Sequence, residues 1–297
     1  MMPDLPGADP SLRAALHGVR GLLLDLDGVL VLKGAPVPGA VEAVRALDRA
    51  GVPYLVVTNT SLMSRAALAR WGAKAGFTTP ADRFQSALSA SAAIVGRELA
   101  GRAVYVICSE EARTEFSGLN VVSGEQADAD PSSVAAVVLG DSPEELTKAN
   151  LDRASRLVLA GTQLIGMHRN PWWLTPEGPT LDAGTFLVGL EWATKRKARI
   201  VGKPSPAFFT AAVERLRSEA AARGEPRLRR RDLAMIGDDV GADVGGGHRA
   251  GLRTVFVRSG KHGDADLATA AARGRGAVRP DAVAPSIAEV VAAVLAT

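Results

Sequence analysis

Short apolar runs alternate with stretches of helical periodicity over most of the chain. Apolar runs of strand length end at Asp25 and near Thr58, and further runs lie at 103–108, 134–140, 162–167, 233–239 and 254–260. Helical patterns lie between them, such as residues 39–50, which stop at Gly51, a residue type that favours helix C-termini. This alternation predicts an α/β fold whose parallel strands are joined by helices.

Residues 89–195 have a βα rhythm of their own, which predicts a second α/β domain inserted into the first. The expected fold is therefore a Rossmann-like, doubly wound parallel sheet with an inserted α/β domain. The first domain would comprise residues 1–88 and 196–297, and the inserted domain residues 89–195.

Composition narrows the classes of protein to which the chain can belong. Its 297 residues are 47% hydrophobic and 23% charged, which is typical of a globular protein. No apolar run approaches the ~20 residues of a membrane helix, so no membrane partner is expected. The net charge of +3 is slight for this length, so nucleic acid is not an expected partner either. The single cysteine, Cys108, favours the cytoplasm and is expected to pack in the core.

Polar groups follow four of the apolar runs, at the strand ends where open α/β sheets bind their ligands. The residues are Asp25 and Asp27, Thr58 and Asn59, Lys203, and Asp238 with Asp239. If the four strands are neighbours in one parallel sheet, these groups meet at one edge of it.

A cluster of carboxylates without histidine or cysteine is an oxygen-only site, which suits Mg²⁺. The same residue types suit phosphoryl transfer, because an aspartate can form an aspartyl-phosphate and a lysine with the metal can hold the phosphate charge. The four groups therefore predict a magnesium-dependent reaction of a small phosphorylated substrate.

The segments DLDGV, TN, GKPSP and GDDVGADVGG, in this order, resemble the four motifs of the haloacid dehalogenase superfamily of phosphatases. The resemblance implies that Asp25 is the nucleophile and a metal ligand. Asp27 would protonate the leaving oxygen, activate the water that cleaves the aspartyl-phosphate, and bind Mg²⁺ through its backbone carbonyl. Asp238 would complete the set of metal ligands. Asp239 and Asp243 would support these ligands from outside, or would reach the metal through a water molecule.

The resemblance also implies the substrate-binding residues and the type of inserted domain. Thr58 and Asn59 would bind the transferring phosphoryl group, and Lys203 would pair with that group and with Asp25. About 145 residues separate Thr58 from Lys203, which is room for an α/β cap of the C2 type, as in the type IIA, NagD-like members. On the segments LDAGTFLVGLEWAT, IVGKPSPAFF, MIGDDVGADVGG and VRSGK, the chain resembles the branch that contains phospholysine phosphohistidine inorganic pyrophosphate phosphatase, and the similarity runs from residue 20 on. This similarity implies hydrolysis of a small phosphomonoester, phosphoramidate or pyrophosphate, and a homodimer through the cap.

Several interpretations stay open at this point. A phosphotransferase or mutase, or a module that binds phosphate without turnover, would use the same residues. Asp141 imitates the fourth motif without its second acid and is interpreted as a structural turn or helix cap. Trp172 and Trp173 either pack or select the leaving group. His248 stands where a polar amide is expected, and it is interpreted as an exposed helix residue.

Overall fold

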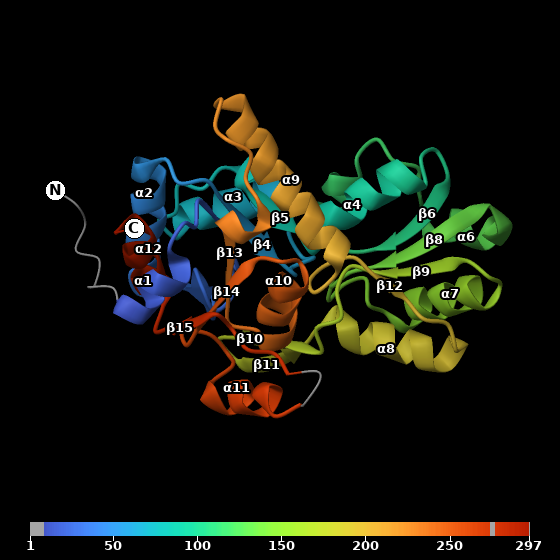
Figure 1. Cartoon of the computed structure of the whole chain (residues 1–297). Helices are drawn as coiled ribbons and strands as arrows, with labels where there is room; N and C mark the ends of the chain where they lie inside the picture. The colour runs from blue at the N-terminus through green and yellow to red at the C-terminus, as the bar shows by residue number, and fades with distance from the viewer. Residues whose placement is uncertain (1–8, 274–276, 297) are drawn as a thin grey trace. The chain divides into compact units, whose positions relative to one another are not determined.

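The computed structural model describes residues 9–273 and 277–296 (Figure 1). The chain forms two compact units. Unit 1 comprises Met1–Thr58, Ala69–Gln85 and Lys203–Thr297, and unit 2 comprises Asn59–Leu68 and Ser86–Gly202. The assignment of residues 1–88 and 196–297 to a catalytic core and of residues 89–195 to a cap stays a prediction.

Unit 1 contains a six-stranded sheet with the order β15-β14-β13-β1-β4-β5. The strands are β1 (Gly21–Leu24), β4 (Tyr54–Thr58), β5 (Phe84–Ser86), β13 (Leu233–Gly237), β14 (Arg253–Val257) and β15 (Ala282–Ala284). The apolar β1 lies between β13 and β4 and pairs with both in parallel. The carboxyl ends of these three strands therefore lie side by side.

Apart from α1, which lies in a segment that the sequence indicates to be a loose lead-in to the first strand, the helices of unit 1 follow the predicted periodicity. They are α1 (Pro10–Leu16), α2 (Ala40–Ala50), α9 (Pro206–Ala222), α10 (Gly246–Arg249), α11 (Asp264–Ala271) and α12 (Ile287–Leu295), while α3 (Arg65–Lys74) runs from unit 2 into unit 1. The helix predicted over 39–50 is confirmed and ends at Gly51, whose φ of 66° is left-handed. A short hairpin, β2 (Val31–Leu32) and β3 (Ala35–Pro36), follows the tip of β1.

Unit 2 contains a five-stranded sheet with the order β12-β9-β8-β6-β7, in which every pairing is parallel. The strands are β6 (Ala103–Ile107), β7 (Val121–Val122), β8 (Val134–Leu139), β9 (Gln163–Gly166) and β12 (Arg199–Ile200). Because β12 pairs with β9, the strand before Lys203 is not a neighbour of β1. The condition that all four polar groups follow neighbouring strands of one sheet is therefore not met for Lys203.

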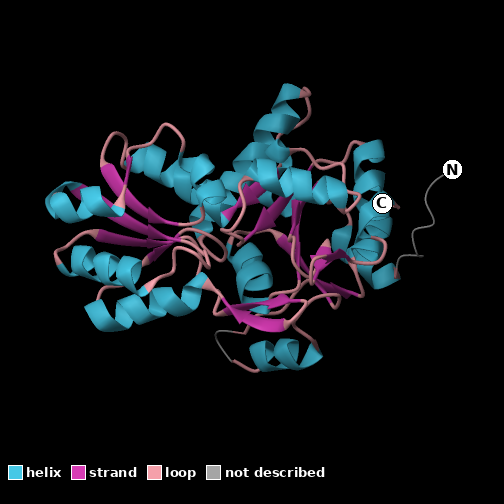
Figure 2. Cartoon of the chain, turned by 180° about the vertical axis from the view of Figure 1, so that it is seen from behind, coloured by secondary structure: helices cyan, strands magenta, loops and turns pink. Residues whose placement is uncertain are grey.

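Alternate residues of the unit 2 strands pack on opposite faces of the sheet. Val104 and Val106 of β6 pack in one hydrophobic cluster with α4 (Ala87–Glu98), and Tyr105 and Ile107 pack in another with α7 (Lys148–Leu159) and α8 (Ala183–Thr194). Helices accordingly cover both faces, as Figure 2 shows. Cys108 is fully buried in the first cluster, as predicted. The predicted parallel α/β fold is confirmed.

The remaining elements of unit 2 are short. They are α5 (Glu110–Arg113), α6 (Gly124–Ala129) and an antiparallel hairpin of β10 (Trp172–Thr175) and β11 (Gly178–Leu181). Within residues 9–273 and 277–296, no helix combines the length and the apolar character needed to cross a membrane.

Candidate active site

The carboxyl ends of β1 and β13 bring two predicted site residues together. Asp25 follows β1 and Asp238 follows β13, and the register pairs Leu24 with Ile236, one residue before Asp25 and two residues before Asp238. Both aspartates are buried, and Lys203 is buried with them. Lys203 Nζ lies 2.7 Å from Asp25 Oδ1 and 2.7 Å from Asp243 Oδ1. The structure thus brings together residues that lie far apart in the sequence.

Asp243 reaches this cluster because the chain after β13 forms one turn of π-helix, Val240–Gly245. The Val244 amide donates to the carbonyl of Asp239, five residues earlier, at 3.2 Å. The Asp239 carboxylate accepts from the amides of Gly241 and Ala242 and so holds the start of this turn. Single π-turns are frequent at functional sites. Here the turn brings the Asp243 carboxylate close to those of Asp25 and Asp238, while its predicted place behind the metal ligands stays a prediction.

The charges of the cluster do not balance within the protein. Carboxylate oxygens of Asp25, Asp238 and Asp243 all lie within 4.8 Å of one another, while Lys203 supplies one positive charge between two of them. Three ionised carboxylates and one ammonium group leave two negative charges in a buried site. A hard divalent cation with oxygen ligands, such as Mg²⁺, fits this donor set.

Burial and like charges make the acids of this cluster hard to ionise. Burial, with help from the charge of Asp238, raises the pKa of Asp25 to about 6, although Lys203 opposes the shift. Burial and the charge of Asp243 likewise raise the pKa of Asp238 to about 6, and burial raises the pKa of Asp243 well above its usual range. Burial alone would lower the pKa of Lys203, but Asp243 and Asp25 raise it instead. The two neighbouring carboxylates therefore favour the charged form of Lys203.

Three other predicted residues lie near the strand tips, and their roles stay predictions. The side chain of Asp27 is exposed, two residues beyond the buried Asp25. Thr58 ends β4 and is buried. Asn59, the next residue, is also buried but belongs to unit 2, where its Nδ2 donates to Asn170 Oδ1 at 3.2 Å. The division between the units thus falls between the two residues predicted to bind phosphate.

Side-chain contacts explain why residues 59–68 belong to unit 2. The amide and hydroxyl of Ser64 donate to the Glu111 carboxylate at 2.8 and 2.6 Å. The amide and guanidinium of Arg65 donate to Glu115 at 2.6 and 3.2 Å. The sequence analysis missed this segment because its partners lie about 50 residues away in the sequence.

A second buried polar cluster lies at the carboxyl ends of β8 and β9, within unit 2. Ser61 Oγ lies 3.1 Å from His168 Nε2 and accepts from the Asp141 amide at 2.8 Å. His168 Nε2 also lies 3.4 Å from Asp182 Oδ1, and His168 Nδ1 accepts from the Asn170 amide. These contacts join separate loops. Asp141 lies in a loop, in agreement with its interpretation as a structural turn.

The residues whose interpretation was open lie as follows. Trp172 and Trp173 are half-buried in β10 of unit 2, and their part in leaving-group selection stays a prediction. His248 is exposed on α10, as predicted.

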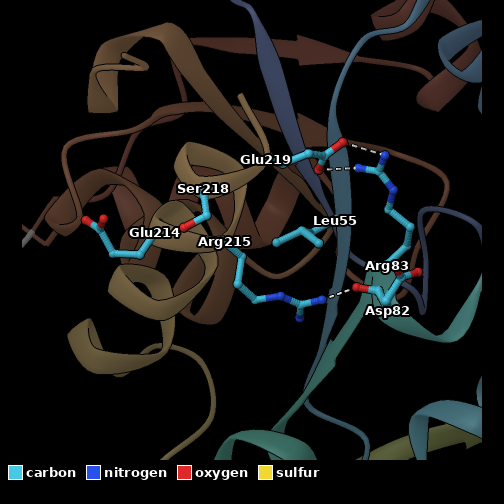
Figure 3. Close-up of a pocket in the computed structure, with 7 residues that line it drawn as sticks. All are labelled: Leu55, Asp82, Arg83, Glu214, Arg215, Ser218 and Glu219. Atoms are coloured by element: carbon cyan, nitrogen blue, oxygen red, sulfur yellow. Dashed lines mark hydrogen bonds and ion pairs between the residues drawn. The ribbon is translucent and has the colours of Figure 1, made fainter. Parts of the chain in front are cut away.

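A hollow of about 510 Å³ lies in unit 1 beside α9 (Figure 3). Two arginines line it, but both already form hydrogen bonds with other residues of unit 1. Arg83 forms a two-pronged ion pair with Glu219 at 2.7 and 2.6 Å, and Arg215 donates to the carbonyls of Phe84 and Asp82. These bonds fix the segment before unit 2 to α9, so we do not assign the hollow to substrate phosphate.

Comparison with known proteins finds one family along the chain. The family of haloacid dehalogenase-like hydrolases matches residues 22–122, and a HAD-hydrolase-like family matches residues 200–290. The human haloacid dehalogenase-like hydrolase domain-containing protein 2 is 34% identical over 85% of this chain and 89% of its own. Human phospholysine phosphohistidine inorganic pyrophosphate phosphatase is 33% identical over 84% of this chain and 87% of its own.

Solved structures with the same fold cover nearly the whole chain. A p-nitrophenyl phosphatase from Archaeoglobus fulgidus has a TM-score of 0.77 at 26% identity, and the match covers 92% of this chain and 98% of that one. A glycerol phosphate phosphatase from Mycobacterium tuberculosis, in complex with magnesium, has a TM-score of 0.76 at 25% identity, covering 93% and 77%. NagD from E. coli shares the fold, with a TM-score of 0.76 at 24% identity, covering 91% and 98%.

Proposed function

The chain belongs to the haloacid dehalogenase-like hydrolases and is a phosphatase, and from this premise we propose that it hydrolyses a small phosphorylated metabolite through an aspartyl-phosphate on Asp25, with Mg²⁺ as cofactor. One observation carries the proposal. The ammonium group of Lys203 lies 2.7 Å from both Asp25 and Asp243, in a buried site that also holds Asp238.

The surroundings of Asp25 suit a nucleophile of fixed orientation. Its Oδ1 accepts from the amide of Leu26 at 2.7 Å and from Lys203 at 2.7 Å. These two donors hold the plane of the carboxylate and favour its ionised form. In the proposed first step an oxygen of Asp25 attacks phosphorus, and the bond from phosphorus to the leaving oxygen breaks.

Asp27 is the proposed acid and base. Its carboxyl group donates a proton to the leaving oxygen in the first step. Its carboxylate then takes a proton from a water molecule, whose oxygen attacks phosphorus, breaks the bond to Asp25 and releases inorganic phosphate. The exposed position of Asp27 beside the buried Asp25 supports this division of roles. Thr58 and Asn59 are proposed to orient the phosphoryl oxygens.

The proposed cofactor would be held by the carboxylates of Asp25 and Asp238 and by the backbone carbonyl of Asp27. Mg²⁺ would supply positive charge to the carboxylates and to the transferring phosphoryl group. Asp243, which is hydrogen-bonded to Lys203 and to the Asp239 amide, fixes the lysine rather than the substrate. Its carboxylate lies within 4.8 Å of those of Asp25 and Asp238, so it would be near enough to support the cation through a water molecule.

Phosphate release from p-nitrophenyl phosphate and from a panel of phosphomonoesters, phosphoramidates and pyrophosphate, with and without Mg²⁺, tests this function. We expect Mg²⁺-dependent release that is lost in Asp25→Asn. An unchanged rate in that variant would refute the mechanism. Transfer of the phosphoryl group to an added acceptor, in place of water, would identify the phosphotransferase alternative. The homodimer through the cap and the cytoplasmic location stay predictions.

A further inference from the structure

Two glycines border the side chain of Asp238. A Cβ at Gly28, whose φ is 83°, would lie 2.4 Å from Asp238 Cγ, and a Cβ at Gly260 would lie 2.0 Å from Asp238 Oδ2. Real Cβ atoms do not approach other atoms so closely, so this position of the carboxylate requires glycine at both places. Gly260 lies beyond β14 and outside the motifs that predicted the site.

The residues on either side of Gly260 hold the same region by hydrogen bonds. The Lys261 amide donates to Asp238 Oδ2 at 2.8 Å. The Ser259 hydroxyl donates to the carbonyl of Gly28 at 2.6 Å. The turn 259–261 therefore bonds to both the carboxylate of Asp238 and the loop that follows Asp25 and Asp27.

We propose that Ser259 and Gly260 are positioning residues for the cation site. Because Gly260 has no side chain, the Asp238 carboxylate fits beside it. The Lys261 amide then binds one oxygen of that carboxylate, and this bond fixes the direction of the second oxygen. Ser259 holds the Gly28 carbonyl and thereby the loop that carries Asp27. Partners of this kind typically change metal affinity by about 10–100-fold when they are removed.

The inference rests on the proposed magnesium site, and its test separates the two. Isothermal titration calorimetry with Mg²⁺ on the metal-free protein should give one binding event, which Asp238→Asn abolishes. Failure of the unaltered protein to bind Mg²⁺ would overturn both the proposed site and this inference. Mg²⁺ binding that Asp238→Asn loses, but that changes in Ser259 and Gly260 leave intact, would overturn the inference alone.

Gly260→Ala is the main variant, with Gly263→Ala as its matched control, because a Cβ at Gly263 meets nothing within 4 Å. We expect Gly260→Ala to weaken Mg²⁺ binding by about 10–100-fold and Gly263→Ala to leave it unchanged. If Gly260→Ala does not fold, Ser259→Ala decides the question. We expect this variant to bind Mg²⁺ about fivefold more weakly, because it lacks one hydrogen bond. Ser259→Thr, which keeps the hydroxyl, should restore binding.

A kinetic readout distinguishes positioning from general loss of structure. In Ser259→Ala the Mg²⁺ concentration for half-maximal activity should rise, while kcat at saturating Mg²⁺ should stay near that of the unaltered protein. A fall in kcat that excess Mg²⁺ does not restore, with an unchanged Mg²⁺ affinity, would contradict the proposal.

Discussion

Both sheets carry a buried polar cluster at the carboxyl ends of their parallel strands, but the two clusters differ in how their acids are placed. In unit 1, three carboxylates share the single cation Lys203. In unit 2, the side chains of Ser61, His168 and Asp182 are joined to one another and to backbone amides. The unit 1 cluster has a deficit of positive charge that a metal ion can fill. In the unit 2 cluster, the hydrogen bonds connect separate loops to one another. Three carboxylates within reach of one cation, more than polarity at a strand end, therefore mark the candidate metal site.

The largest expected effect is on phosphate release, when one aspartate of each cluster is replaced in turn by asparagine. Asp25→Asn keeps the shape of the side chain but removes the proposed nucleophile, so we expect phosphate release from p-nitrophenyl phosphate to fall by more than about a thousandfold. Asp141→Asn is the matched change in unit 2 and should keep most of the activity. Equal losses in the two variants would remove the distinction between the clusters.

Removing the shared cation should strongly destabilise unit 1. Lys203→Met leaves Asp25 and Asp243 buried without their partner, and breaking a buried ion pair from one side costs about 3–5 kcal/mol. Urea denaturation in EDTA measures the free energy of unfolding. Lys148→Met, which breaks the exposed pair with Asp152, should change it little. Similar stabilities of the two variants would show that Lys203 does not hold the cluster.

Magnesium should stabilise the folded protein through one cluster only. At a hundredfold excess over its dissociation constant, a ligand adds about 2.7 kcal/mol to the free energy of unfolding. We expect Mg²⁺ to stabilise the unaltered protein and Asp141→Asn, but not Asp238→Asn, in thermal unfolding followed by circular dichroism. Stabilisation of Asp238→Asn to the same extent would locate the ion elsewhere.

The smallest expected effect concerns pH and unit 2. Burial, followed by the charge of Asp182, raises the pKa of Asp141 to about 6 from 3.8. The folded state therefore binds more protons than the unfolded state between these values, and the contribution of Asp141 to stability falls as pH rises from 4 to 6.

Asp141→Asn removes that titration. With screening by solvent taken into account, it should raise the free energy of unfolding by about 1 kcal/mol at neutral pH and have little effect near pH 4. Urea denaturation at both pH values measures the difference. A gain of the same size at both pH values would show that the charge of Asp141 is not its cause.

The sequence allowed much of unit 1 to be predicted, because its strands are apolar runs and several of its candidate site residues directly follow them. Asp25 and Asp238 are examples, since the pairing of β1 with β13 brings their positions together. Lys203 was predicted in the site for a partly wrong reason. The strand before it has only two residues, Arg199–Ile200, and such a short strand does not reveal which sheet it joins.

Other features depend on interactions that no local pattern records. Asp243 lies in a single π-turn, Val240–Gly245, that directly follows the strand end carrying Asp238, and a local pattern of polar and apolar residues does not predict such a turn. The contacts of Ser64 with Glu111 and of Ser259 with Gly28 join positions 47 and 231 residues apart. Pairings of this kind are fixed by tertiary packing, which is why the turn 259–261 did not emerge from the motifs.

The most direct test of the account is to locate a bound cation. Crystals grown with Mn²⁺ in place of Mg²⁺ would reveal the ion by its anomalous scattering. We expect one strong peak bounded by the carboxylates of Asp25 and Asp238, and none near Asp141 and Asp182. A peak in unit 2 with none in unit 1, or no peak at saturating Mn²⁺, would contradict the claim that the charge deficit of the unit 1 cluster makes it the metal site.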